Sequence, residues 1–258
     1  MSVHVQNTRM TTTRLRKMKQ EGEKIAMLTS YDFTLTRLLD EAGIEMILVG
    51  DSASNIVCGN KYTLPITVDE MIFLTKGVVR AADHALVVID MPFGSYQVSE
   101  EQAVTNALKM MKESGADAVK LEGGEEILPA IRHMVQAGVP VMGHLGLTPQ
   151  SVNQLGGYGL RGKGEAEAEK LLHDAKLLDE AGIDMILVGD SASNIVCGNR
   201  YPLPITVDEM IFLTKGVVRA AEHALVVIDM PFGSYQVSEE QAVSNALKMM
   251  KESRVQMR

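Results

Sequence analysis

The chain has no tryptophan and few aromatic residues of any kind. Aromatic residues make up 4% of its 258 positions, whereas apolar residues as a whole make up 46%. The buried core must therefore be built from aliphatic residues and from methionine, which occurs 17 times. This length is common both for a single α/β barrel and for two small domains, so length alone leaves the number of domains open.

Cysteines and long apolar runs are also scarce, and both absences limit the cellular compartments in which we expect the protein. Its two cysteines, Cys58 and Cys197, are too few for a disulfide framework and favour a reducing compartment. No stretch approaches the roughly 18 consecutive apolar residues of a membrane-spanning helix. Residues 1–10 (MSVHVQNTRM) contain no apolar signal segment. We therefore expect a cytoplasmic protein that has no membrane partner.

Positively charged residues are also fewer than negatively charged ones. Lysine and arginine contribute 25 residues against 33 aspartate and glutamate, which gives a formal net charge of −8. This balance argues against nucleic acid and against anionic membranes as partners. The basic residues near the start predict a solvated helix face rather than a binding patch; they are Arg14, Arg16, Lys17 and Lys19.

The sequence does contain a long internal repeat. Residues 38–114 return as residues 177–253, at an offset of 139 (177 − 38), with five differences. The differing pairs are Glu45/Asp184, Lys61/Arg200, Thr63/Pro202, Asp83/Glu222 and Thr105/Ser244. Solenoid repeats are usually about 20–50 residues long and occur at least three times, so this is a duplicated part of one domain. We name residues 38–114 the first copy and residues 177–253 the second copy.

Short apolar runs alternate with longer helical patterns along the chain. The runs are typical of parallel strands buried on both faces, and the expected strands are Lys24–Ser30, Met46–Gly50, Ala85–Asp90, Ala118–Glu122, Pro140–His144, Met185–Gly189 and Ala224–Asp229. The expected helices are 35–42, 67–82, 99–114, 125–137 and 165–181. Capping boxes at Thr67/Glu70 and Ser99/Gln102 mark two helix starts, and glycines mark helix ends.

This alternation predicts an α/β fold of the TIM type, because strands followed by helices form right-handed parallel units. The pattern has seven strands, whereas a closed barrel of this type has eight. We therefore expect one domain over residues 1–258 with an incomplete barrel. Its last two strands would duplicate strands two and three, and strand edges would be left without a neighbour.

Carboxylates follow three neighbouring strands of this predicted sheet. Asp51, Asp90 and Glu122 each stand at the end of a strand. The carboxyl ends of barrel strands meet on one face, where active sites lie. One such carboxylate is often only a turn residue, but three at matching positions indicate a site, and their oxygens suit Mg²⁺. We therefore predict that these three residues bind a magnesium ion.

Further polar residues fall near the same strand ends. Lys120 lies two positions before Glu122, so both side chains point to one side of their strand, and its ammonium would suit a substrate carboxylate. Ser52 follows Asp51 and either binds an anion or caps the next turn. His144 ends the fifth strand, but a single histidine is more often structural, and spacing alone assigns it no role. The run Thr148–Gly164 is either a functional loop or a connector.

Four motifs resemble one enzyme family. They are VGDS (49–52), DMPFGSYQ (90–97), KLEGG (120–124) and GHLGLTPQSVNQLGGY (143–158), in this order. They resemble the ketopantoate hydroxymethyltransferases, barrel enzymes of pantothenate biosynthesis. The resemblance implies transfer of a hydroxymethyl group from 5,10-methylenetetrahydrofolate to 3-methyl-2-oxobutanoate. It runs from about Thr11 to about Gly182 and then restarts from an earlier point.

The resemblance also implies roles for individual residues. The positions that match Asp51 and Asp90 hold Mg²⁺ in the family, and the match to Glu122 lies near or on the metal. The matches to Asp51, Ser52, Asp90 and Lys120 bind the 2-oxo acid, whose neighbouring C–H the metal makes acidic. The family forms homo-oligomers, so we expect an oligomer here.

The chain departs from the family where the catalytic base belongs. The family base is a glutamate at the end of strand six, after a segment EAG. Here the segment at 179–182 (DEAG) leads into the second copy, and Gly189 stands at the position of the base. Asp190 comes next, but it would point to the opposite side of a strand, so it is only a weak candidate.

This departure leaves the activity of the chain open to three readings. We expect low or no hydroxymethyl transfer. One alternative is a pseudoenzyme that binds metal and a 2-oxo acid, and the other is an Mg²⁺-dependent lyase or mutase that acts on 2-oxo acids. Asp190, Ser191 and Asp229 would repeat the ligand positions without a partner equivalent to Lys120 or Glu122, so we expect no second working site.

Overall fold

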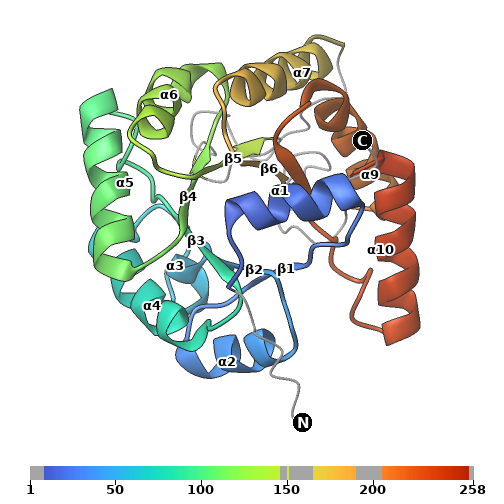
Figure 1. Ribbon diagram of the computed structural model, residues 1–258, viewed down its shortest axis with the longest axis horizontal. Helices are drawn as coiled ribbons and strands as arrows, with labels where there is room; N and C mark the ends of the chain where they lie inside the picture. The colour runs from blue at the N-terminus through green and yellow to red at the C-terminus, as the bar shows by residue number, and fades with distance from the viewer. Residues whose placement is uncertain (1–8, 146–149, 151–164, 190–204, 256–258) are drawn as a thin grey trace. The chain divides into compact units, whose positions relative to one another are not determined.

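The computed structural model describes residues 9–145, 150, 165–189 and 205–255 (Figure 1). Seven strands and the helices between them follow one another in chain order, which confirms the α/β fold of the TIM type. The chain divides into two compact units, residues 1–120 with 137–140 and residues 121–136 with 141–258. The single domain expected from the sequence stays a prediction. Within the described ranges, no helix is both long and apolar enough to span a bilayer.

The first unit is a run of parallel strands with helices between them. Its elements are α1 (Thr12–Glu21), β1 (Met27–Thr29), α2 (Phe33–Glu41), β2 (Met46–Val49), α3 (Ala53–Ile56), α4 (Val68–Ala81), β3 (Leu86–Asp90), α5 (Glu100–Ser114) and most of β4 (Ala118–Glu122). Strand β1 pairs with β2, β2 with β3 and β3 with β4, always in parallel. Helix α4 packs between α2 and α5 (Figure 1).

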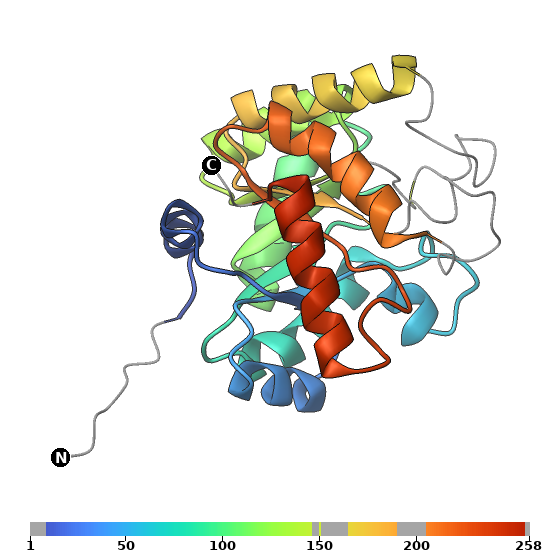
Figure 2. The ribbon, with the colours of Figure 1, turned by 90° about the vertical axis from the view of Figure 1, so that its right-hand side faces the viewer.

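The second unit repeats this arrangement. Its elements are η1 (Glu125–Ile127), α6 (Leu128–Gln136), β5 (Val141–Leu145), α7 (Glu165–Glu180), β6 (Met185–Val188), α9 (Val207–Ala220), β7 (Leu225–Ile228) and α10 (Glu239–Ser253). Strand β5 pairs with β6 and β6 with β7, again in parallel. Helix α9 packs between α7 and α10, as Figures 1 and 2 show.

Local sequence sets the helix starts in both units. The Thr67 hydroxyl accepts a hydrogen bond from the Glu70 N–H at 3.2 Å, and the Glu70 carboxylate accepts one from the Thr67 N–H at 2.8 Å. Thr206 and Glu209 form the same capping box at the start of α9. Ser99 accepts from the Gln102 N–H at 3.1 Å, but Gln102 Oε1 has no partner among the described residues, so the capping box expected here is only half formed. These bonds satisfy N–H groups that the first helical turn cannot pair internally.

All seven expected strands are present, with ends that differ by a few residues. Every residue of β2, β3, β4, β5 and β6 is buried, as the continuous apolar runs predicted. The helix expected at 125–137 begins as the 3₁₀ turn η1 before α6. Helix α3 was not expected, because four residues are too short to show a helical period. The run Thr148–Gly164 lies outside the described residues, except for Gln150.

Candidate metal and substrate site

The centre of the candidate site is a buried ion pair between β3 and β4. Asp90 lies directly opposite Lys120 in the parallel register of the two strands. The Lys120 ammonium donates to Oδ2 of Asp90 at 2.6 Å, and the two residues are only 3% and 1% exposed. A buried ammonium is strongly unfavourable without such a partner. The strand register therefore fixes two of the residues that the sequence assigned to the site.

Asp51 joins this pair through its backbone. Its N–H donates to the same Oδ2 atom of Asp90 at 3.2 Å, and the residue is 5% exposed. Asp51 directly follows Gly50 at the end of β2, the strand that pairs with β3. The carboxyl ends of β2 and β3 thus bring Asp51 and Asp90 together, as the sequence predicted.

Ser52 makes a hydroxyl pair with a residue that the sequence analysis missed. Its Oγ lies 2.7 Å from the Tyr31 hydroxyl, and it makes no side-chain cap to α3. A Cβ atom at Gly50 would lie 3.1 Å from Ser52 Oγ, so a glycine there leaves room for this hydroxyl. Tyr31 comes just after β1, and the rule that found Asp51 after β2 would also have found it.

The Tyr31 phenol is neutral near pH 7, and burial moves its ionisation to still higher pH. Removal of the ring from water raises the pKa of Tyr31 above its ordinary value, while its hydrogen bond to Ser52 acts in the opposite direction. The nearby negative charges of Asp90 and Asp51 raise the pKa further. Tyr31 is therefore a neutral hydroxyl that can donate or accept a hydrogen bond at the edge of the site.

Glu122 has its own hydrogen-bonding partners. Its Oε1 lies 3.1 Å from His144 Nδ1, and its Oε2 accepts from the Gln150 N–H at 3.0 Å. The side chains of Glu122 and His144 are 1% and 5% exposed. His144, to which spacing alone gave no role, is thus in contact with a predicted site residue.

Asp51, Asp90 and Glu122 form an acidic triad that could hold a metal ion. Among the described residues they are the one such group, all three are buried, and each offers an oxygen within 4.8 Å of the others. Three ionised carboxylates with one Lys120 ammonium carry a formal charge of −2 (−3 + 1). Buried negative charge of this size is unfavourable unless a cation offsets it. A hard oxygen set of this charge fits a divalent ion such as Mg²⁺.

Among the described residues, the second copy differs from the first at one position of this arrangement. Asp229, which corresponds to Asp90, is only half-buried, whereas Asp90 is buried. The two copies diverge in sequence after Ser114 and Ser253. Asp190 and Ser191 lie outside the described residues.

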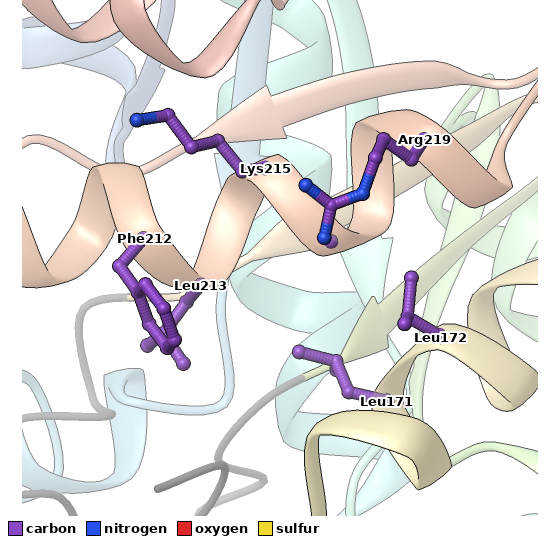
Figure 3. A pocket seen from close by; sticks show the side chains of 7 residues that line it. Leu171, Leu172, Phe212, Leu213, Lys215 and Arg219 are labelled. Carbon is purple, nitrogen blue, oxygen red and sulfur yellow. The ribbon is translucent and has the colours of Figure 1, made fainter. Parts of the chain in front are cut away.

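An apolar groove in the second unit lies apart from these residues. Leu171 and Leu172 of α7 face Phe212, Leu213 and Gly216 of α9 across a space of about 120 Å³, with Lys215 and Arg219 at its rim (Figure 3). None of its lining residues belongs to the candidate site. It is a gap between two packed helices with no convergent polar groups, so it lacks the features of a substrate pocket.

Solved structures identify the class of fold. Phosphonopyruvate hydrolase, solved in complex with oxalate and Mg²⁺, matches with a TM-score of 0.63 at 15% identity, over 92% of this chain and 78% of that one. A 2,3-dimethylmalate lyase of the PEP mutase/isocitrate lyase superfamily matches with a TM-score of 0.58 at 13% identity, over 91% of this chain and 78% of that one. Likeness at this identity shows a shared fold and nothing about chemistry.

The family follows from the sequence itself. The profile of the ketopantoate hydroxymethyltransferase family matches residues 9–183 and, a second time, residues 174–257. The chain therefore belongs to this family of enzymes. The double match reflects the two copies, because the second match begins just before the second copy.

Individual relatives agree with this assignment. The 3-methyl-2-oxobutanoate hydroxymethyltransferase of Phocaeicola vulgatus is 61% identical over 174 residues, and that of Bacteroides fragilis is 60% identical over 174 residues. Each match covers 67% of this chain and 64% of the relative. The chain thus matches less than two thirds of the length of these relatives.

Proposed function

We propose that this chain acts in the reaction of its family. This reaction transfers a hydroxymethyl group to 3-methyl-2-oxobutanoate and gives ketopantoate. The one-carbon donor would be 5,10-methylenetetrahydrofolate. The observation that carries the proposal is the buried pair of Asp90 and Lys120 beside Asp51. These residues lie in the motifs VGDS, DMPFGSYQ and KLEGG, through which the sequence resembles the family.

The acidic triad would hold the Mg²⁺ of this reaction. Asp51 and Asp90 would bind the ion, and Glu122 would bind it or support it. When bound, the ion supplies Lewis-acid polarisation of the 2-oxo group, which makes the neighbouring C–H acidic. The buried setting of the three carboxylates favours this role, because charge interactions are stronger away from water.

Lys120 and Ser52 would orient the substrate. The 2-oxo acid carries a carboxylate at neutral pH, and Lys120 places a buried positive charge two residues from Glu122 on β4. Ser52 offers a hydroxyl whose direction the contact with Tyr31 restricts. A fixed ammonium and a fixed hydroxyl together would select a planar 2-oxo acid over a neutral carbonyl compound.

A second candidate function is binding of the metal and the 2-oxo acid with little turnover. Gly189, which follows β6 at the position of the family base, is buried and has no side chain to take a proton. A general base must reach the proton that it removes, and its loss lowers the rate of that step by roughly 10²–10⁴-fold. Asp190 remains a weak candidate for this role.

Two assays on one set of variants test both candidates. Calorimetry measures binding of 3-methyl-2-oxobutanoate with and without Mg²⁺, and a second assay measures ketopantoate formation with 5,10-methylenetetrahydrofolate. Asp90→Ala is the test variant, and Asp229→Ala, at the corresponding position of the second copy, is its matched control. We expect Mg²⁺-dependent binding that Asp90→Ala abolishes and Asp229→Ala preserves.

Turnover then separates the two candidates. Ketopantoate formation that disappears in Asp90→Ala would support hydroxymethyl transfer and would mean that a residue other than the family glutamate supplies the base. Mg²⁺-dependent binding without ketopantoate would support the second candidate. A chain that binds neither the ion nor the 2-oxo acid would rule out both.

A further inference from the structure

His144 and Gln150 together fix both oxygens of Glu122. The His144 ring reaches Oε1 through Nδ1 at 3.1 Å, and the Gln150 N–H reaches Oε2 at 3.0 Å. His144 is the fourth residue of β5, in which every residue is buried. A histidine held in a buried strand has few alternative rotamers, so it is a rigid support for the carboxylate that it contacts.

The contact with Glu122 favours one tautomer of this ring. An ionised carboxylate can only accept a hydrogen bond, so Nδ1 of His144 would be the donor. The other nitrogen, Nε2, is buried and has no hydrogen-bond partner among the described residues.

We propose that His144 is a positioning residue that orients Glu122 toward the divalent cation. This inference rests on the proposed function, since it requires the acidic triad to bind the ion. A ligand carboxylate held at both oxygens before the ion arrives loses little freedom on binding, and the affinity rises accordingly. His144 therefore acts through Glu122.

Two substitutions separate the hydrogen bond from the bulk of the ring. His144→Asn keeps a donor, because the asparagine Nδ2 stands at the same distance from the backbone as the histidine Nδ1. His144→Leu keeps apolar volume and removes the donor. His84→Leu is a matched control, since His84 is also a buried histidine, in the loop before β3, and belongs to no candidate site.

The decisive measurement is the dissociation constant for Mn²⁺, a paramagnetic ion that serves as a probe of the Mg²⁺ position. Electron paramagnetic resonance measures this constant. Loss of a residue that orients a metal ligand typically weakens affinity about 10–100-fold. We expect a loss of this size in His144→Leu, a clearly smaller loss in His144→Asn, and no change in His84→Leu. Near-ultraviolet circular dichroism identifies variants that have lost their fold.

The outcomes of the Mn²⁺ measurement distinguish failure of the His144 proposal from failure of the proposed function. No Mn²⁺ binding by the unmodified chain would defeat the proposed function and this inference with it. Binding by the unmodified chain that His144→Leu leaves unchanged would overturn the inference alone. Equal weakening in His144→Leu and His144→Asn would also overturn it, because the donor would then have no part in the effect.

A second measurement keeps the inference testable if His144→Leu does not fold. Long-range ¹H–¹⁵N correlation spectra of the unmodified chain report which ring nitrogen of each histidine carries the proton. His144→Asn assigns the His144 signals by their disappearance. We expect the Nδ1–H tautomer, and a proton on Nε2 alone would contradict the hydrogen bond to Glu122.

Discussion

The first and second copies have nearly the same sequence but differ in what they bury. In α5 the buried residues are Ala103, Ala107, Met110 and Ser114, whereas in α10 only Met249 and Ser253 are buried. All five residues of β3 are buried, whereas β7 becomes half-buried from its third residue onward. The comparison teaches that the neighbours of a segment, as well as its own pattern, decide how much of it is buried.

The neighbours explain the direction of this difference. Strand β3 lies between β2 and β4, whereas β7 pairs only with β6 among the described residues. A strand with one neighbour leaves backbone groups and side chains on its other edge open to solvent or to another segment. In the part of the chain that the structure describes, the last strand of the second copy therefore has one neighbour where that of the first copy has two.

The difference is reversed in the helices that precede these strands. Helices α4 and α9 have identical sequences, but α9 buries Leu213, Gly216 and Val218, whose counterparts in α4 are not buried. Only Ala220 is less buried than its counterpart in α4, Ala81. Helix α4 packs on the nine residues of α2, and α9 packs on the sixteen residues of α7. The longer partner covers more of the helix, so the same amphipathic sequence becomes more deeply buried.

The largest difference in unfolding free energy between matched variants of the two copies is expected at two aspartates. These are Asp90, which ends β3, and Asp229, which follows β7. Asp90→Ala leaves the buried ammonium of Lys120 without its partner, and the loss of one member of a buried pair lowers the free energy of unfolding by about 3–5 kcal/mol. Asp229→Ala, at a half-buried position, should lower it by less than about 1 kcal/mol. Urea unfolding of both variants measures the difference.

Equal losses of unfolding free energy in Asp90→Ala and Asp229→Ala would contradict the difference between the two copies. They would mean that the second copy also holds its aspartate in a tightly coupled pair. The control is Asp90→Ala combined with Lys120→Met, which removes both charges. It should recover much of the loss, because no unpaired charge then stays buried.

The next contrast lies in the helices that end the two copies. Ala107→Leu adds three carbon atoms at a fully buried position of α5, and overpacking of this kind lowers stability by about 1–3 kcal/mol. Ala246→Leu, at the half-buried equivalent in α10, should change it by less than about 0.5 kcal/mol. Thermal unfolding of the pair measures both effects, and a larger loss from Ala246→Leu would show that α10 is covered after all.

A smaller effect is expected where the copies end. Helix α5 ends at Gly115 with φ 83°, whereas α10 ends at Arg254, the one residue other than glycine with positive φ in the described ranges. This conformation is unfavourable for an L residue by roughly 1 kcal/mol. Arg254→Gly should therefore stabilise the chain by about that amount in urea unfolding.

The reverse substitution is the control for this position. A Cβ atom at Gly115 would lie 3.1 Å from Cγ1 of Val79, so Gly115→Ala adds a close contact to the backbone strain. It should destabilise the chain by more than Arg254→Gly stabilises it. If Arg254→Gly lowers stability, the arginine side chain contributes more than the strain removes.

The smallest expected effect is a pH dependence at Asp179, because opposing influences act on this carboxyl. Burial raises the pKa of Asp179, while hydrogen bonds from the Ala224 N–H, the His223 ring and the N–H groups of Glu222 and His223 lower it more, to below the ordinary value of 3.8. Its contribution to stability is therefore present above pH 3.8 and disappears as the pH falls through the lowered value.

Asp179→Asn should expose this dependence. The difference in unfolding free energy between the unmodified chain and the variant should shrink as the pH falls from about 5 to about 2. Urea unfolding over this range measures it. A difference that stays constant would mean that the ionised form of Asp179 has no advantage in the folded state.

Much of the fold could be predicted from the sequence, because it depends on local patterns. The apolar runs that become β2, β3 and β4 are buried on both faces, and such strands are recognisable without knowledge of their neighbours. The start of α4 follows from Thr67 and Glu70 alone. The duplication can be recognised directly from the sequence, and the family profile matches the chain twice.

The candidate site was less accessible to prediction. Asp51, Asp90, Lys120 and Glu122 stand out because charged residues interrupt apolar strands. Their direct contacts depend on strand register, which no single segment encodes. His144 was assigned no role because a single histidine near the end of a strand is common, and its contact with Glu122 distinguishes it. Tyr31 was missed although it directly follows β1, a position at which the rule used for Asp51 applies.

The shared sequence of two strands has a consequence for how the chain reaches its fold. Strand β1 pairs with β2, whose residues MILV also form β6, so two identical partners compete for β1 during folding. Met27 is 19 residues from Met46 (27 to 46) but 158 from Met185 (27 to 185). Closing the longer loop is less favourable by about 2 kcal/mol. Chain connectivity, rather than side-chain recognition, therefore favours the correct partner, by a factor of roughly 24.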